Sequence, residues 1–241
     1  MKAVVVILVA LFAICYGQFF ANIRLPDEAL DFAMKNPAQK AAKTENPAVC
    51  ITVNFKRCQS AFDNILGFDT TLDWKNSFAL TDAIQNYAQG DRIKFLNLCY
   101  ARSYFYQCLG AQYASCVSLY NLLDEDGSTA SEAYNFVQTF HSLDFICNAG
   151  FEEVLNQYAC MKGVTTGSPD YDMCISNFST KLGQQPQQFC SHVNETSQCI
   201  QKAFSKGCQA TDPRGSGWFG CETFRQSFEE TCGETSRCFV H

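Results

Sequence analysis

The side chains best suited to chemistry in this chain of 241 residues are its 15 cysteines. Three are spaced along CYARSYFYQCLGAQYASC, from Cys99 to Cys116, and three more along CSHVNETSQCIQKAFSKGC, from Cys190 to Cys208. Structural zinc sites usually place cysteines about two to four residues apart, and thioredoxin-like redox sites need C-x-x-C. The closest pair here, Cys232 and Cys238, is six residues apart. The spacing therefore favours structural disulfides over metal or redox chemistry.

The cysteines of the first segment cannot bond one another if that segment is helical. At a rise of about 1.5 Å per residue, Cys99 and Cys108 would lie on opposite faces of the helix, roughly 13 to 14 Å apart. A disulfide needs Cα atoms within about 7 Å of each other. Each cysteine must then reach a different neighbouring element, and the segment becomes a scaffold.

The first 17 residues have the layout of a secretory signal peptide, with Lys2, an apolar run from Ala3 to Tyr16, and then Gly17. The run of about 14 residues is too short to span a bilayer comfortably, and we expect no membrane span. Loss of this segment removes Cys15 and leaves an even number of cysteines. We therefore predict a secreted, extracellular protein. Its predicted disulfide cysteines are Cys50, Cys58, Cys99, Cys108, Cys116, Cys147, Cys160, Cys174, Cys190, Cys199, Cys208, Cys221, Cys232 and Cys238.

Residues suited to catalysis are sparse. After the signal peptide the chain holds His141, His192 and His241, none of them in H-E-x-x-H, and it has no G-x-S-x-G. His141 lies near Asp144 on the polar side of a predicted helix, which is typical of a surface contact. We predict no catalytic residues, no metal site, no cofactor and no enzymatic activity. Because two carboxylates need only meet in space, a secreted hydrolase stays open as an alternative.

The acidic segment LLDEDGSTASE resembles part of a calcium loop, because Asp124, Asp126 and Gly127 fall at positions 3, 5 and 6 of an EF-hand. Leu122 and Ala133 would then stand at the first and last ligand positions, where neither can bind through its side chain. We interpret the segment as a solvated turn that caps the next helix.

Three positions suit attached sugars. Asn177 and Asn194 begin N-glycosylation sequons, which predicts a glycoprotein. Ser216-Gly217, in DPRGSGWFG, is the dipeptide on which glycosaminoglycan chains start, but acids are sparse around it. We interpret that stretch as a plain loop.

Aromatic residues make up 14% of the chain, and they could line a cavity for an apolar ligand between disulfide-linked helices. The richest place is the first cysteine segment. The candidate lining residues are Tyr100, Tyr104, Phe105, Tyr106 and Tyr113.

Helix patterns recur along the chain, and strand patterns do not. Residues 91–108 begin with Asp91 as an N-cap, and residues 127–150 begin with Thr129 and Glu132 in a capping-box relation and end at Gly150. A short helix is predicted at PDEALDFAMK, with Pro26 in its first turn. We predict an all-α, disulfide-rich fold.

The cysteines follow the same order twice, which predicts two tandem related helical repeats. CQSAFDNIL from Cys58 matches CISNFSTKL from Cys174, and each copy holds six cysteines. The first set is Cys50, Cys58, Cys99, Cys108, Cys116 and Cys147, and the second is Cys160, Cys174, Cys190, Cys199, Cys208 and Cys232. Cys221 and Cys238 are left over to pair with each other. The predicted division is a leader or docking arm at 18–49, a first repeat at 50–150 with an insertion near 68–91, and a second repeat at 151–241.

The signal peptide, the cysteine trio around Gln107-Cys108-Leu109 and the ending Phe145-Ile146-Cys147-Asn148-Ala149-Gly150 resemble the secreted cysteine-rich domains of unknown function common in nematodes. The pattern is also weakly similar to chondroitin-proteoglycan core proteins. The resemblance implies no catalytic residues.

The formal net charge of −6 becomes −7 once Lys2 is removed with the signal peptide, and the chain has no basic run. This argues against nucleic acid and anionic membranes as partners. We expect a secreted, non-enzymatic protein that binds an extracellular protein, a glycan or a small apolar molecule. A carrier of an apolar ligand is the main alternative to matrix or partner binding.

Overall fold

The protein is described by a computed structural model over residues 19, 22–35, 49–125, 127–233 and 237–239. Within these ranges every regular element is an α- or 3-10 helix, and none is a strand, which confirms the all-α prediction. No helix among the described residues is both long and apolar enough to cross a bilayer. The predicted signal peptide, Asp126 and His241 lie outside the described residues.

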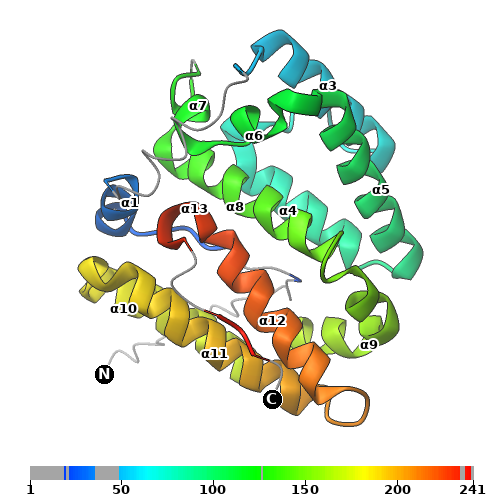
Figure 1. Ribbon diagram of the computed structural model, residues 1–241, viewed down its shortest axis with the longest axis vertical. Coiled ribbons are helices and arrows are strands. Elements are labelled where there is room, and N and C mark those ends of the chain that lie inside the picture. Colours follow the sequence, from blue (N-terminus) through cyan, green and yellow to red (C-terminus); the bar gives the residue numbers. More distant parts are fainter. Residues whose placement is uncertain (1–18, 20–21, 36–48, 126, 234–236, 240–241) are drawn as a thin grey trace, which may run out of the picture.

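Four long helices build the first part of the fold, in the upper half of Figure 1. They are α3 (Thr52–Leu66), α4 (Ser77–Ala88), α5 (Arg92–Leu109) and α8 (Ala130–Ile146). The short elements between them are η1 (Trp74–Asn76), η2 (Gly110–Gln112), α6 (Tyr113–Cys116) and α7 (Leu119–Leu123). α3 packs along α5, and α4 packs against both α5 and α8.

The second part of the chain forms another four long helices. They are α9 (Phe151–Gly167), α10 (Pro169–Gln184), α11 (Phe189–Gly207) and α12 (Pro213–Ser227), with the shorter η3 (Pro186–Gln188) and α13 (Glu229–Cys232). α11 packs along α10 on one side and most extensively along α12 on the other, and α12 in turn packs on α8 of the first part (Figure 1).

Local sequence signals set the helix ends. The Asp91 side chain accepts a hydrogen bond from the backbone N–H of Lys94 at 2.8 Å, so it caps α5 as predicted. Thr129 caps α8 in the same way, but Glu132 does not complete a capping box. Its carboxylate instead accepts from the Ser77 hydroxyl and from the backbone N–H of Phe78, which ties α8 to α4.

The stretch DPRGSGWFG is not the loop expected from its glycines. Asp212 caps the N-terminus of α12, Pro213 takes the first helical position, and Ser216 and Gly217 lie buried inside the helix. The reason is close packing: a Cβ at position 217 would overlap the Ser205 hydroxyl of α11. Buried Ser216, whose hydroxyl donates to Gln157 Oε1 at 2.8 Å, is inaccessible to a glycosaminoglycan chain in the folded protein.

Phenylalanines fill the core on both sides of the molecule. In the first part, Phe105 stands 4.9 Å from Phe140, centroid to centroid, and Phe55 stacks on Trp74 at 4.6 Å. In the second part, Phe178 meets Phe224 edge-on at 5.2 Å. All six aromatic side chains are buried, and aromatic pairs of this kind stabilise a core beyond their buried area.

The described part of the leader lies docked on the helical body. Phe19 is buried with ring centroids 6.1 Å from Phe95 and 5.5 Å from Tyr158, so it bridges α5 and α9. Asn22 donates to Asp82 of α4 at 2.8 Å. Helix α1 (Asp27–Met34) then packs on α10, α11 and η3 through a buried apolar face.

The region of the predicted insertion, residues 68–91, holds η1 and α4. Trp74 is fully buried, and Thr81 forms a hydroxyl–hydroxyl hydrogen bond of 2.7 Å with Thr139 of α8. This segment is therefore part of the core of the first half rather than a surface loop.

Candidate functional site

The cysteines form seven disulfides, and no bond joins two members of one trio. The first part is linked by Cys50–Cys116, Cys58–Cys108 and Cys99–Cys147, and the second by Cys160–Cys208, Cys174–Cys199 and Cys190–Cys232. In each set the first cysteine pairs with the fifth, the second with the fourth and the third with the sixth. The two remaining cysteines, Cys221 and Cys238, pair with each other. Among the described residues, no group of three or more His, Cys, Asp or Glu could hold a metal ion.

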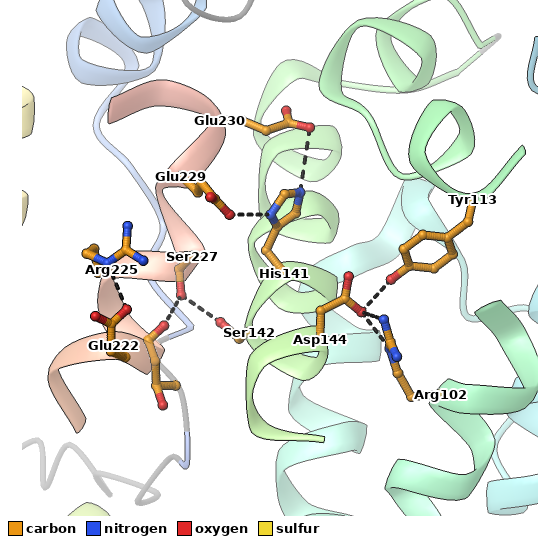
Figure 2. A network of polar contacts seen from close by, with 11 residues as sticks. Arg102, Tyr113, His141, Ser142, Asp144, Glu222, Arg225, Ser227, Glu229 and Glu230 are labelled. Atoms are coloured by element: carbon orange, nitrogen blue, oxygen red, sulfur yellow. Dashed lines mark hydrogen bonds and ion pairs between the residues drawn. The ribbon is translucent and has the colours of Figure 1, made fainter. Parts of the chain in front are cut away.

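A polar network lies where α8 meets the neighbouring helices (Figure 2). On one side of α8, the Asp144 carboxylate accepts from Arg102 Nε at 2.5 Å and from the Tyr113 hydroxyl at 2.6 Å. Burial alone would lower the pKa of the Arg102 guanidinium, but the charges and hydrogen bonds of Asp144 and Tyr113 together raise it above its usual value. Burial and the same carboxylate raise the pKa of Tyr113 well above its usual value. The three groups form a fixed clamp between α5, α6 and α8.

His141 lies one turn before Asp144 on α8 and points toward Glu229 and Glu230 in Figure 2. Its Nδ1 lies 3.9 Å from Glu229 Oε2, and its Nε2 lies 3.6 Å from Glu230 Oε1. Burial alone would lower its pKa, but the contacts with both carboxylates outweigh burial and raise the pKa of His141 to about 10. The ring is therefore an imidazolium at neutral pH. It bridges charges between two helices and is poorly suited to act as a general base.

The remaining described histidine, His192, is buried in α11, and its Nδ1 lies 3.9 Å from Glu195 Oε2. The histidines thus stand in separate places, each beside carboxylates. His141 contacts Glu229 and Glu230 rather than the Asp144 that follows it in sequence.

The five candidate ligand-lining aromatics do not share one cavity. Tyr100 and Tyr104 are exposed on the outer face of α5, at 62% and 42% of their surface. Tyr106 is exposed on another side of the helix, beside a hollow of about 390 Å³. Phe105 and Tyr113 are buried in the core, where their rings meet at 5.9 Å. Consecutive aromatic residues on a helix point in different directions, so the cluster in the sequence separates in space.

The outward tyrosines belong to a longer apolar stripe along α5. Ile93, Leu96, Tyr100 and Tyr104 are all exposed, and their spacing of three or four residues places them on one helical face. Tyr104 also lines a groove of about 330 Å³ between α3 and α5, together with Arg57 and Ala61. We call this surface, from Ile93 to Tyr104 with Arg57, the aromatic face.

The two sequons both lie on the hairpin of α10 and α11. Asn177 is exposed on α10. Asn194 is partly buried on α11, where its Oδ1 accepts from Gln198 at 3.4 Å, and Thr196 of the same sequon is buried. The fold therefore leaves more room for a glycan at Asn177 than at Asn194.

Sequence reasoning missed a groove between α11 and the segment of residues 237–239. The Cys221–Cys238 disulfide brings residues 237–239 back over α11, and Gln201 Nε2 donates to the Phe239 carbonyl at 2.7 Å. Between this segment and α11 lies a groove of about 760 Å³. Its lining includes Gln201, Lys202, Lys206, Pro213, Arg237 and Phe239. The unmatched cysteine pair was the available signal, because an extra disulfide near the end of a chain must anchor that end to something.

Comparison with known proteins does not assign the chain to a family. No protein-family model, curated protein or solved structure matches it. The described fold defines an all-α, disulfide-rich protein whose seven disulfides fit an oxidising, extracellular setting.

Proposed function

We propose that the protein is a secreted, non-enzymatic binding protein that engages an acidic protein partner through the aromatic face of α3 and α5. The observation that carries the proposal is the exposed apolar stripe of α5. Single exposed apolar residues are ordinary, but four in line on one helix are a contiguous patch of the kind that marks interaction sites.

The second half of the chain supplies an internal comparison for this stripe. With Cys99 and Cys108 matched to Cys190 and Cys199, buried positions of α5 fall on buried positions of α11, as Leu98 does on Phe189 and Leu109 on Ile200. The exposed positions differ. Ile93, Leu96, Tyr100 and Tyr104 fall on Gln184, Gln187, Ser191 and Glu195. Of these, Ser191 and Glu195 lie on α11, whereas Gln184 ends α10 and Gln187 lies in η3. The helix in the equivalent disulfide setting thus folds with polar residues at the two tyrosine positions, so packing of the fold does not require the tyrosines.

The matched pairing order of the disulfides supports treating α3–α5 and α10–α11 as equivalent. On this basis we extend the proposal to the architecture: the chain is a tandem pair of related helical modules. The resemblance to secreted cysteine-rich nematode domains agrees with this reading and stays a prediction.

The charges around the stripe favour an acidic partner. Lys56, Arg57, Arg92 and Lys94 are exposed on α3 and α5, whereas the one acidic residue within these two helices, Asp63, is buried. The face is thus locally basic on a chain whose formal net charge is −6. Opposite charges steer association and select partners.

The apolar residues favour a protein over a polysaccharide. Tyrosine and arginine are enriched at the centres of protein interfaces, and aliphatic groups such as Ile93 and Leu96 gain from burial against other apolar side chains. A sugar chain would satisfy the cations and the tyrosine rings but would leave these aliphatic groups without an apolar contact.

The test is selection of peptides from a random library displayed on phage, using the purified protein as bait. We expect enriched peptides to combine acidic residues with apolar or aromatic anchors. The double variant Tyr100→Ser with Tyr104→Glu installs the residues that α11 carries at these positions. Truncating a hot-spot aromatic costs about 2 kcal/mol, so the pair should weaken binding by roughly 30-fold or more.

Met173→Ser is the matched control, because Met173 is also exposed but lies on α10 in the other half. It should leave peptide affinity unchanged. Heparin, measured in parallel, tests the polysaccharide alternative. Peptides without acidic residues, equal binding by the double variant, or tighter binding to heparin that also depends on the tyrosines would overturn the proposal.

A further inference from the structure

We propose a second and separate binding site, the hollow beside Tyr106, and we assign it to a neutral sugar unit of a glycan chain. Its described lining residues are Arg102, Ser103, Tyr106, Gln107 and Asn148, and we call this site the polar hollow. Its volume of about 390 Å³ lies within the range of small-molecule sites, roughly 300 to 1,000 Å³. None of these residues belongs to the apolar stripe of α5, so the site does not depend on the function proposed for the aromatic face.

The walls of the polar hollow are held in place by contacts within the protein. The ring of Tyr106 packs edge-on against Tyr113, with centroids 4.9 Å apart, and the guanidinium carbon of Arg102 lies 5.1 Å from the Tyr106 centroid. Asn148, in the turn after α8, donates from its Nδ2 to the Asp144 carbonyl at 2.6 Å. A ligand therefore finds these groups already positioned and loses little affinity to ordering them.

The charges at the polar hollow cancel. Arg102 is the one charged side chain among the described lining residues, and its Nε and Nη2 both contact the Asp144 carboxylate (Figure 2). The Asp144 side chain is 31% exposed, so it remains close to any ligand that approaches the guanidinium. An anion would meet repulsion from Asp144, and a cation would meet repulsion from Arg102. A neutral ligand avoids both.

The polar groups of the hollow offer hydrogen bonds in both directions. The Ser103 hydroxyl and the Gln107 amide make no hydrogen bond with any described residue. An amide presents both donors and an acceptor, and a hydroxyl can serve as either. A sugar matches this pattern, because each of its hydroxyl groups can donate and accept. An apolar ligand would remove water from these groups without replacing the hydrogen bonds.

Tyr106 supplies a flat surface for the sugar ring. Its side chain is 48% exposed, although its neighbours fix its position. A tyrosine ring gives a rigid contact area with an apolar body and a polar tip. The C–H groups of a sugar can lie on the ring while its hydroxyl groups reach Ser103 and Gln107.

The second half of the chain lacks these groups. With the same cysteines matched, Arg102 falls on Val193 and Tyr106 on Ser197, and both of these residues are buried in α11. The helix in the equivalent disulfide setting thus folds without the tyrosine, so packing does not require the exposed ring on α5.

The experiment is saturation-transfer difference NMR on the intact, disulfide-bonded protein with the methyl glycosides of glucose, galactose, mannose and N-acetylglucosamine. We expect saturable binding of at least one of these neutral sugars, while glucuronate and glucosamine should bind about fivefold more weakly or worse. Tyr106→Ala should raise the dissociation constant by about tenfold or more, and Gln107→Ala by about threefold or more.

Asp144→Asn tests the balance of charge. It keeps the shape of the side chain but leaves the guanidinium of Arg102 without its counter-ion. The variant should therefore bind glucuronate more tightly than the neutral sugar. A merely structural effect would weaken both sugars and would not reverse their order.

Gln198→Ala is the matched control, because Gln198 occupies on α11 the position of Gln107 and does not line the polar hollow. It should bind the sugars like the unmodified protein. The double variant Tyr100→Ser with Tyr104→Glu disables the aromatic face and should keep full sugar binding, so the failure of one proposal is visible apart from the failure of the other. If Tyr106→Ala does not fold, Gln107→Ala still decides. No binding of a neutral sugar, equal binding of glucuronate, or full binding by Gln107→Ala would overturn the assignment.

Discussion

Asp63 carries a carboxyl group whose ionisation the fold opposes, and this makes the stability of the protein depend on pH. Asp63 is fully buried in α3, where its Oδ1 accepts from Gln59 Nε2 at 3.1 Å and its Oδ2 has no hydrogen-bond partner among the described residues. Burial raises the pKa of Asp63 from 3.8 to about 7. The bond from Gln59 acts in the opposite direction, and the charges of Asp73 and Asp69 add to the rise.

A raised pKa in the folded state means that the folded protein holds this proton more tightly than the unfolded chain. The stabilisation is fully present below about pH 4 and is lost as the pH rises through about 7. A shift of about three pH units corresponds to on the order of 4 kcal/mol. That is a large fraction of the free energy of unfolding of a typical domain.

Asp63→Asn keeps the shape of the side chain and the hydrogen bond from Gln59, but it cannot ionise. We expect the variant to match the unmodified protein near pH 4 and to exceed its free energy of unfolding at pH 8, by up to about 4 kcal/mol. The assay is urea unfolding with the disulfides intact, at pH 4, 5.5, 7 and 8. The exposed Asp172→Asn on α10 is the control and should follow the unmodified protein. Parallel profiles for Asp63→Asn and the unmodified protein would refute the reasoning.

Three further perturbations test the packing and the charge bridge. His141→Gln should lower the free energy of unfolding at pH 6 by only about 1–2 kcal/mol, because solvent screens the partly exposed carboxylates that face His141. Urea titrations should show this difference vanish as the pH rises through about 10. Gly217→Ala should lower the melting temperature, because the new methyl group overlaps Ser205 and costs about 1–3 kcal/mol. Gly163→Ala, in an open stretch of α9, should raise the melting temperature slightly. Phe19→Ala should cost about 3 kcal/mol and expose the leader to limited proteolysis; an unchanged cleavage rate would contradict the docked position of this segment.

The helices and the separation of the trio cysteines followed from local rules that hold in most proteins. Asp91 caps α5 because an aspartate before an amphipathic run can accept a backbone N–H, whatever the helix packs against. Likewise, the distance between Cys99 and Cys108 along a helix forbids their bond and forces each toward another element, as observed.

The features that could not be predicted depend on contacts between segments far apart in the chain. In the sequence, Asp63 is an ordinary polar residue of a predicted helix. Only the packing of α3 in the structure shows that its side chain is fully buried. The prediction of a loop at Ser216 is wrong for the same reason. Gly217 lets α12 pack close to α11 and does not form a turn. Predicting the groove between α11 and residues 237–239 requires the positions of both Cys221 and Cys238 in space. The spacing of cysteines along the chain does not provide these positions.

The contact between α8 and α12 indicates how the two proposed modules pack against each other. Ser142 and Ser227 meet there in a hydroxyl–hydroxyl hydrogen bond of 2.6 Å, and they are 85 residues apart, as are the matched Cys147 and Cys232. Equivalent residues of two copies can touch each other only near a two-fold axis, which is the property of an isologous interface.

The contacts on either side of this point are reciprocal to within one residue. The Tyr134 hydroxyl of α8 forms a hydrogen bond of 2.5 Å with the Thr231 hydroxyl. Phe219 is the residue that corresponds to Tyr134. Its ring contacts Phe145, which is next in sequence to the residue that corresponds to Thr231. This favours an ancestral module that paired with itself before the two copies were joined in one chain. On the proposed duplication, each copy could then change its outer face, because the shared interface lies on α8 and α12.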